Sequence, residues 1–363
     1  MTIPNSFSPA DASALATQIK NRAAELGFQQ VGITDTHLST HIERYQNWLA
    51  ADYHGEMDYM GKHGSKRWNP EELVAGTLRV IAVRMDYLSD PKPPQTQLNQ
   101  PDKAYISRYC LGRDYHKLIR SRLKKLIQFI QESSQQADCR AFVDSAPVLE
   151  RALTQKAGLG WFGKNCMIIN RAAGSWFFLG EIYTNLPLPL DQPYQQEHCG
   201  RCTACLDICP TQAFVGPYVL DGRRCISYLT IELKGTIPLE LRSKMGNRIF
   251  GCDDCQLVCP WNRFSKASPE SDFTPRHRLD QSSLIELFNW DETTFQNNTE
   301  GSAIRRAGYE SWQRNIAVAL GNAPSTPKTI AALKLKQNSD SEIVREHIDW
   351  ALEQHTNKHP KNR

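Results

Sequence analysis

The chain has 363 residues, 40% of them hydrophobic, and a formal net charge of +4 at pH 7. This length is enough for about two or three domains with hydrophobic cores of their own. Residues 1–26 lack the basic and apolar regions of a signal peptide, and no apolar run approaches the roughly 18 residues that a membrane span needs. We therefore expect a cytoplasmic protein that is neither exported nor inserted into a membrane.

The first half of the chain alternates helical and strand patterns. Leu15, Ile19, Ala23 and Leu26 share one helical face, which ends at Gly27. The same reading predicts helices over 118–130 and 145–157, strands over 31–34, 80–87 and 140–143, and a hairpin that joins 167–170 to 176–183 around Arg171–Ser175. This alternation predicts a layered α/β domain over residues 1–190.

Two further parts follow this domain. The stretch 186–193 contains three prolines and predicts a linker. A cysteine-rich part then covers 191–270, and 271–363 has helical patterns around Trp312 and Ile348 that suggest one HEAT-like helical repeat. A single repeat cannot bury its own apolar face, so we expect it to dock on the rest of the protein. The fold class is therefore α+β.

Eight of the eleven cysteines lie between Cys199 and Cys259. A disulfide framework is typical of short exported chains, so metal ligation is the better explanation here. The run Cys199-x2-Cys202-x2-Cys205-x3-Cys209-Pro matches the bacterial ferredoxin motif, in which three thiolates bind one [4Fe-4S] cluster and the fourth reaches the other cluster. The second run, Cys252-x2-Cys255-x3-Cys259-Pro, lacks one cysteine of the same pattern, and Cys225 is the upstream thiol that completes it.

These spacings predict two [4Fe-4S] clusters with four thiolates each. The first set is Cys199, Cys202, Cys205 and Cys259, and the second set is Cys209, Cys225, Cys252 and Cys255. A pair of zinc sites with four cysteines each is the alternative, although zinc ribbons usually present separated C-x2-C pairs. The other three cysteines, Cys110, Cys139 and Cys166, are expected to be isolated buried thiols.

Asp144 is the candidate acid of the first domain. It lies between the strand 140–143 and the helix 145–157, where a carboxylate is often only a helix cap. The functional alternative is a proton donor, for which burial would raise the pKa of Asp144 toward neutrality. A second pattern, Gly158-x-Gly160-x-x-Gly163, resembles a dinucleotide-binding motif, but a helix precedes it and a strand follows, which excludes that site.

Basic residues gather in two regions. The stretch from Arg223 to Arg248 contains six basic and two acidic residues, and the residues from Gly301 onward are also net basic. Two basic regions on an otherwise acidic body suggest a polyanionic partner, with solvated surface charge as the alternative.

Several longer motifs resemble the epoxyqueuosine reductase family. They are Ile106-Ser-Arg-Tyr-Cys-Leu-Gly-Arg-Asp-Tyr-His116, Phe142-Val-Asp-Ser-Ala-Pro-Val-Leu-Glu-Arg151, Gly158-Leu-Gly-Trp-Phe-Gly-Lys-Asn165, Gly251-Cys-Asp-Asp-Cys-Gln-Leu-Val-Cys-Pro-Trp-Asn262, Arg314-Asn-Ile-Ala-Val-Ala-Leu-Gly-Asn322 and His347-Ile-Asp-Trp350. The resemblance covers most of the chain.

The resemblance implies a cobalamin-binding domain akin to that of reductive dehalogenases, and reduction of epoxyqueuosine to queuosine at the wobble position of tRNA. Cob(I)alamin, fed with electrons by the two clusters, would act on the epoxide, and Asp144 would be the proton donor. The motif D-x-H-x-x-G of proteins that ligate cobalt through histidine is absent from the sequence. Transferred residue by residue, the cobalamin contacts would be Arg67, Cys110, Asp144, Lys164, Asn165, Ser175 and Ser227.

The resemblance also implies tRNA as partner, together with an unidentified low-potential electron donor and a monomeric chain. The candidates for phosphate contacts are Arg223, Arg224, Lys234, Arg242, Arg248, Arg305, Arg306 and Arg314. Two alternatives use the same parts: a cobalamin-dependent reductive dehalogenase of a small molecule, and a non-catalytic ferredoxin-type electron carrier. The basic C-terminal region argues against the first, and the large domain 1–190 is left unexplained by the second.

Overall fold

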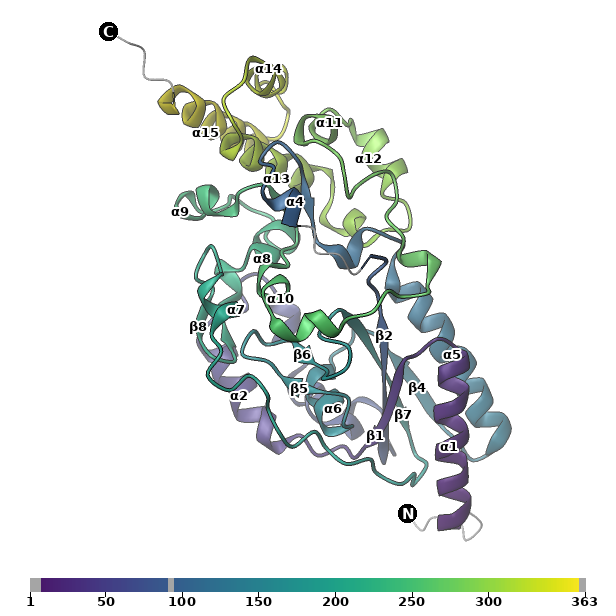
Figure 1. Ribbon diagram of the computed structural model, residues 1–363. Helices are drawn as coiled ribbons and strands as arrows, with labels where there is room; N and C mark the ends of the chain where they lie inside the picture. The colour runs from purple at the N-terminus through teal and green to yellow at the C-terminus, as the bar shows by residue number, and fades with distance from the viewer. Residues whose placement is uncertain (1–7, 91–94, 359–363) are drawn as a thin grey trace.

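Four antiparallel strands form the central sheet of the first domain (Figure 1). Their order is β1 (Gln30–Thr34), β2 (Arg79–Asp86), β7 (Phe177–Thr184) and β4 (Cys139–Phe142). Strands β2 and β7 lie in the middle of the sheet and are buried over nearly their whole length, as expected of strands covered on both faces. The structure is a computed structural model that describes residues 8–90 and 95–358; the outer ends of the expected first and third domains, 1–7 and 359–363, lie outside the described residues.

Two long helices cover one face of this sheet, α1 (Pro9–Glu25) and α5 (Tyr115–Ser133). The apolar face predicted from Leu15 to Ala23 is buried there, beside Leu123 and Leu126 of α5. Both helices begin at side-chain caps, Ser8 for α1 and Asp114 for α5. The other face is covered by α6 (Glu150–Lys156).

Two local predictions for this domain are wrong. The helix expected over 145–157 begins only at Glu150, so residues 145–149 form a loop after Asp144. The expected hairpin does not form either, because β6 (Ile168–Ile169) pairs with β5 (Trp161–Phe162) while β7 joins the central sheet. Between β6 and β7, the isolated β-bridge that the structure shows joins Asn170 and Gly174.

Apart from the 12-residue helix α2, the remaining elements of the domain are short. They are α2 (Ser39–Ala50), α3 (Pro70–Leu73), α4 (Gln95–Leu98) and β3 (Tyr105–Ile106), with the 3-10 turns η1 (Asp58–Met60), η2 (Gly64–Arg67) and η3 (Arg108–Cys110).

The cysteine-rich part consists of short elements joined by turns. These are α7 (Ala204–Asp207), β8 (Phe214–Gly216), β9 (Val219–Leu220), η4 (Gly222–Arg224), α8 (Ile226–Ile231), α9 (Leu239–Arg242), η5 (Ser243–Met245), β10 (Arg248–Phe250), α10 (Asp254–Leu257) and η6 (Pro260–Phe264). Strand β10 pairs in parallel with β3 of the first domain. In addition, the Asp253 carboxylate accepts hydrogen bonds from the Tyr105 and Ser107 hydroxyls, at 2.8 and 2.5 Å. The two parts are therefore fixed to one another.

The last part is helical, as predicted. Its elements are η7 (Ser271–Phe273), α11 (Leu284–Phe288), α12 (Glu292–Asn298), η8 (Ala303–Ala307), α13 (Tyr309–Asn322), α14 (Pro327–Leu335) and α15 (Glu342–Lys358). Helix α13 is buried along almost its whole length, against α15 and against α8 and β10 of the cysteine-rich part. One hydrophobic core thus joins the second and third parts, and the boundary at 270/271, like that at 190/191, stays a prediction. Among the described residues, no helix is long and apolar enough to cross a membrane.

Candidate functional site

The four thiols predicted for the first cluster lie together. Cys199, Cys202, Cys205 and Cys259 line one cavity of about 50 Å³, closed by Trp261 and Pro260 among others. Three of them come from the loop and turn around α7, and Cys259 comes from the end of α10, so the chain must fold back to assemble the set. Burial and the three neighbouring thiols raise the pKa of Cys205 to about 11. A raised pKa means that ionising these thiols costs free energy. A bound iron-sulfur cluster would offset that cost, because its irons hold the cysteines as thiolates.

The second set assembles around α8 and α10. Burial raises the pKa of the Cys225, Cys252 and Cys255 thiols, and Cys209 and Cys225 act on one another electrostatically. The Ala213 N–H donates to Cys209 Sγ at 3.3 Å, a contact of the kind that tunes cluster potentials. All eleven cysteines are free thiols, and the donor chemistry of both sets fits [4Fe-4S] clusters.

Three of the predicted cobalamin contacts lie at the border between the first domain and the thiol loops, and a fourth, Ser227, lies within the cysteine-rich part. The Lys164 ammonium donates to the carbonyls of Gly200 and Cys202, and the Asn165 amide donates to that of Cys255 at 3.2 Å. The Ser175 hydroxyl accepts from Gln256 and Asn262, and Ser227 donates to the Cys225 sulfur. The structure therefore brings Lys164, Asn165 and Ser175 to the border with the thiol loops, while Ser227 lies on α8 beside Cys225 of the second set.

Arg67 and Cys110 lie on other elements. Arg67 is buried, donates to the Tyr59 carbonyl at 2.7 Å, and has a buried Nε without a partner. Cys110 is fully buried and its Sγ donates to the Ser107 carbonyl. The unpartnered Nε of Arg67 is a donor that a polar ligand such as cobalamin could satisfy, so this residue fits the expected role.

Asp144 lies just after the C-terminal end of β4, and its carboxylate has hydrogen-bond partners on α5. Its side chain is 48% exposed, and its carboxylate accepts from the Tyr115 hydroxyl at 2.8 Å and meets His116 Nε2 at 3.0 Å. His116 Nδ1 lies 2.7 Å from the Asp114 carboxylate. Because both nitrogens of His116 have carboxylate partners, this histidine is not free to bind cobalt. The backbone of Asp144 is in the left-handed region, with φ of +50°, which is uncommon for residues other than glycine and concentrates at functional sites.

The proton of this group resides on the histidine. Burial raises the pKa of Asp144, but the hydrogen bond and the charge of His116, together with the Tyr115 hydroxyl, outweigh it and lower the pKa below its ordinary value. Burial likewise opposes the charged form of His116, yet Asp114 and Asp144 raise its pKa to about 9. The expectation that burial would raise the pKa of Asp144 toward neutrality is therefore wrong, and the group that holds the proton beside it is His116.

Sequence reasoning missed Tyr115, His116 and Asp114 as members of this site. They lie in the motif around Cys110, and the signal was present as an aspartate that caps α5 directly before Tyr-His. The local sequence pattern did not show that Asp144, after β4, would lie beside the start of α5. This proximity depends on how α5 packs against the sheet.

The predicted phosphate contacts divide into two groups. Arg223, Lys234, Arg305 and Arg306 are exposed, and Arg224 is partly exposed with its guanidinium on the Thr211 carbonyl. Arg306 forms an ion pair with Glu232. It also acts electrostatically on Asp144, so it lies near Asp144.

The prediction is wrong for Arg242, Arg248 and Arg314. Arg314 is fully buried and donates to the carbonyls of Leu229, Leu233 and Gly235. Arg242 is also buried and pairs with Glu346, while Arg248 is held by two hydrogen bonds to Asp254. These guanidinium groups satisfy internal acceptors and are not available to a phosphate.

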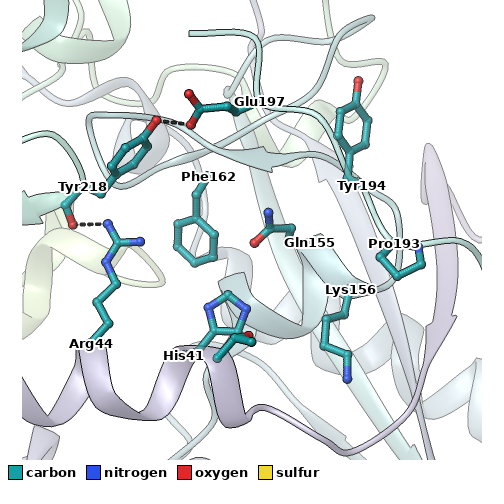
Figure 2. Close-up of a pocket in the computed structure, with 10 residues that line it drawn as sticks. His41, Arg44, Gln155, Lys156, Phe162, Pro193, Tyr194, Glu197 and Tyr218 are labelled. Carbon is teal, nitrogen blue, oxygen red and sulfur yellow. Dashed lines mark hydrogen bonds between the residues drawn. The ribbon is translucent and has the colours of Figure 1, made fainter. Parts of the chain in front are cut away.

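A separate cavity of about 420 Å³ lies between α2, α6 and the turn of β8 and β9 (Figure 2). Its walls include the rings of Phe162, Tyr194 and Tyr218, and Arg44 extends from α2 to the Tyr218 carbonyl. The Tyr218 backbone N–H donates to the Lys164 carbonyl at 2.9 Å, and the Tyr218 side chain acts on Cys199 electrostatically. The cavity thus lies beside the first thiol set rather than beside Asp144.

Comparisons with known proteins match both the region that ends at Asp144 and the cysteine-rich part. The model of the family described as "Epoxyqueuosine reductase QueG, DUF1730" matches residues 67–145, and that of the "4Fe-4S double cluster binding domain" matches 198–262. The epoxyqueuosine reductase of Pseudomonas aeruginosa is 61% identical over 97% of this chain and 98% of its own length, and that of Escherichia coli is 57% identical over 95% and 91%.

Solved structures show the same fold. The epoxyqueuosine reductase of Bacillus subtilis, with its catalytic aspartate loop swung out of the active site, has a TM-score of 0.84 at 28% identity over 94% of this chain and 90% of its own. An epoxyqueuosine reductase with an epoxyqueuosine-modified tRNA-Tyr stem loop has a TM-score of 0.82 at 28% identity, with the same shares covered. The chain therefore belongs to the epoxyqueuosine reductase family.

Proposed function

We propose that this protein reduces epoxyqueuosine to queuosine at the wobble position of tRNA, with two [4Fe-4S] clusters, cobalamin, and Asp144 as the proton donor. The observation that carries the proposal is the joint presence of two four-thiol sets and an acid held by a protonated histidine. The names of the close relatives and the solved complex with a modified stem loop support the substrate.

Each part of the site has a task in this reaction. Conversion of an epoxide to an alkene and water consumes two electrons and two protons, so the enzyme needs carriers of single electrons and a proton donor. When bound, cobalamin would supply the reducing metal centre that acts on the epoxide. Lys164, Asn165, Ser175 and Ser227 would hold it near the two thiol sets, together with Arg67, Cys110 and Asp144 from other elements of the first domain.

The polypeptide itself handles the proton and the substrate. Asp144 receives a proton from His116 and donates it to the departing epoxide oxygen, while Tyr115 fixes the orientation of the carboxylate. Arg223, Lys234, Arg305 and Arg306 would contact tRNA phosphates, and the wobble base would have to be extruded to reach Asp144. The proposal includes a monomeric chain and a low-potential electron donor.

An assay on epoxyqueuosine-containing tRNA tests this function. Protein reconstituted anaerobically with iron, sulfide and cobalamin should form queuosine, detected by mass spectrometry of the digested tRNA. Asp144→Asn should keep iron, sulfide and cobalamin at wild-type levels and lose about 10²- to 10⁴-fold in rate. Normal turnover by Asp144→Asn with full cofactor content would refute the role of Asp144, and a reconstituted wild type that forms no queuosine would refute the function.

A further inference from the structure

Two buried glutamates meet at the backbone of the loop that carries Asp144. Glu181 is on β7, where it lies opposite Phe142 of β4, and its side chain is 0% exposed. Glu150 is the first residue of α6, and its Oε1 accepts the backbone N–H of Asp144 at 2.5 Å. The carboxyl groups of Glu150 and Glu181 are hydrogen-bond partners of one another. A chain of contacts thus leads from the central sheet to the backbone of the acid.

The contact between the two glutamates requires a proton. When both are taken as ionised, neither oxygen of Glu181 has a donor partner among the described residues, and two buried carboxylates side by side repel one another. Burial raises the pKa of both groups, but the Asp144 N–H and the charge of Arg151 favour the ionised form of Glu150. The proton therefore belongs on Glu181, which then donates a hydrogen bond to the Glu150 carboxylate.

The backbone of Asp144 needs such support. Its φ of +50° lies in the left-handed region, which costs free energy for a residue with a side chain and persists where the surrounding structure holds it. Tyr115 and His116 hold the carboxylate of Asp144, whereas Glu150 holds its backbone N–H. A hydrogen bond from Glu181 would fix the Glu150 carboxyl group to β7, which is a central strand of the sheet.

We infer that Glu181 is a protonated carboxylic acid whose hydrogen bond to Glu150 holds the backbone of Asp144 in its catalytic position. The inference rests on the proposed function, because it concerns the placement of the proposed acid. Glu150 and Glu181 are positioning residues that act through the backbone of Asp144, and Glu181 keeps its proton throughout the reaction. The site therefore requires a neutral hydrogen-bond donor at position 181.

Two substitutions separate the donor from the carboxyl group. Glu181→Gln keeps a neutral donor of nearly the same shape, whereas Glu181→Met fills a similar volume without one. Glu181→Gln should keep kcat within about threefold of the wild type, and Glu181→Met should lower kcat at least about tenfold while KM for the modified stem loop stays within about threefold. Iron and cobalamin content should stay at wild-type levels in both variants.

A buried residue on the same helix as Glu150 provides the matched control. The Thr154 side chain is fully buried, and its hydroxyl has no partner among the described residues. Thr154→Val removes this hydroxyl and keeps the shape of the side chain. It should therefore change neither kcat nor KM.

Two further measurements do not depend on activity. At pH 7.5, the infrared difference spectrum of the wild type minus Glu181→Gln should contain the carbonyl stretch of a protonated carboxylic acid. Amide hydrogen exchange over residues 143–149, followed by mass spectrometry, should be at least about tenfold faster in Glu181→Met than in the wild type. Exchange in Glu181→Gln and in Thr154→Val should match that of the wild type.

The outcomes separate this inference from the proposed function. A wild type that forms no queuosine, yet gives the band and the expected exchange rates, would refute the function and support the placement of the proton. A difference spectrum without the band overturns the inference, and this result does not require Glu181→Met to fold. Wild-type kcat and exchange in Glu181→Met would overturn it as well. So would a loss of kcat in Glu181→Gln as large as in Glu181→Met, because the carboxyl group itself would then be needed.

Discussion

The proton on His116 depends on Asp114, a residue that does not touch Asp144. Asp114→Asn removes the negative charge but keeps an oxygen for His116 Nδ1 and remains a good helix cap for α5. Loss of one adjacent opposite charge should lower the pKa of His116 from about 9 by about 1 to 2 units. The substitution therefore changes the protonation of the histidine without removing it.

The size of the effect follows from the fraction of protonated His116. With a pKa of about 9, about three quarters of His116 is protonated at pH 8.5; with a pKa of about 7.5, only about one tenth is. We thus expect kcat/KM to fall about eightfold at pH 8.5 and to remain within a factor of about 1.2 at pH 6.5. The activity falls with rising pH because the pKa of His116 is raised. His116 is fully protonated at low pH and loses its proton as the pH rises through its pKa in the folded state.

The assay is the rate of queuosine formation on a modified stem loop between pH 6 and pH 10. Asp138→Asn, an exposed aspartate on the loop before β4, is the matched control and should leave the profile unchanged. An alkaline limb that stays at about pH 9 in Asp114→Asn would refute the argument that the Asp114 carboxylate holds the proton on His116.

Three further changes probe other parts of the molecule. Cys225→Ala should lower iron from about eight to about four atoms per chain, measured by iron and sulfide analysis, because only one thiol set stays complete; full iron content would remove Cys225 from the second set. Arg306→Gln should weaken tRNA binding and lower the slope of log K against log salt by about 1, while an unchanged slope would place Arg306 outside the interface. Arg314→Met should leave that slope unchanged and destabilise the fold by at least about 3 kcal/mol, seen in thermal unfolding, since three buried carbonyls lose their donor; normal stability would contradict this role.

The clusters could be predicted from the sequence because all but one of their ligands lie in two short runs, 199–209 and 252–259. Three of the thiols of each motif lie within a few residues, so spacing alone restricts the geometry around each set, and the structure brings the first set around one cavity. The same holds for α1 and α5, whose apolar positions repeat with the helical period and are buried as expected.

Other features depended on partners far along the chain. A basic side chain in a sequence does not reveal whether it will meet water or a carbonyl, and Arg314 is buried because α13 crosses α8 and the loop that follows it. Likewise, α6 begins at Glu150, whose carboxylate accepts the backbone N–H of Asp144 from the preceding loop, and the apolar pattern of 145–157 did not show this contact.

The amino-acid sequence by itself determined the kind of chemistry: eight thiols at ferredoxin spacing, one candidate acid at the end of a strand, and the family motifs. Only the tertiary structure decided where the protons lie. The pKa of a carboxyl group is set by the charges and the solvent within a few ångströms, and for Asp144 these come from His116 and Tyr115 of α5 and from Arg306 of η8, which meet Asp144 only in the folded chain.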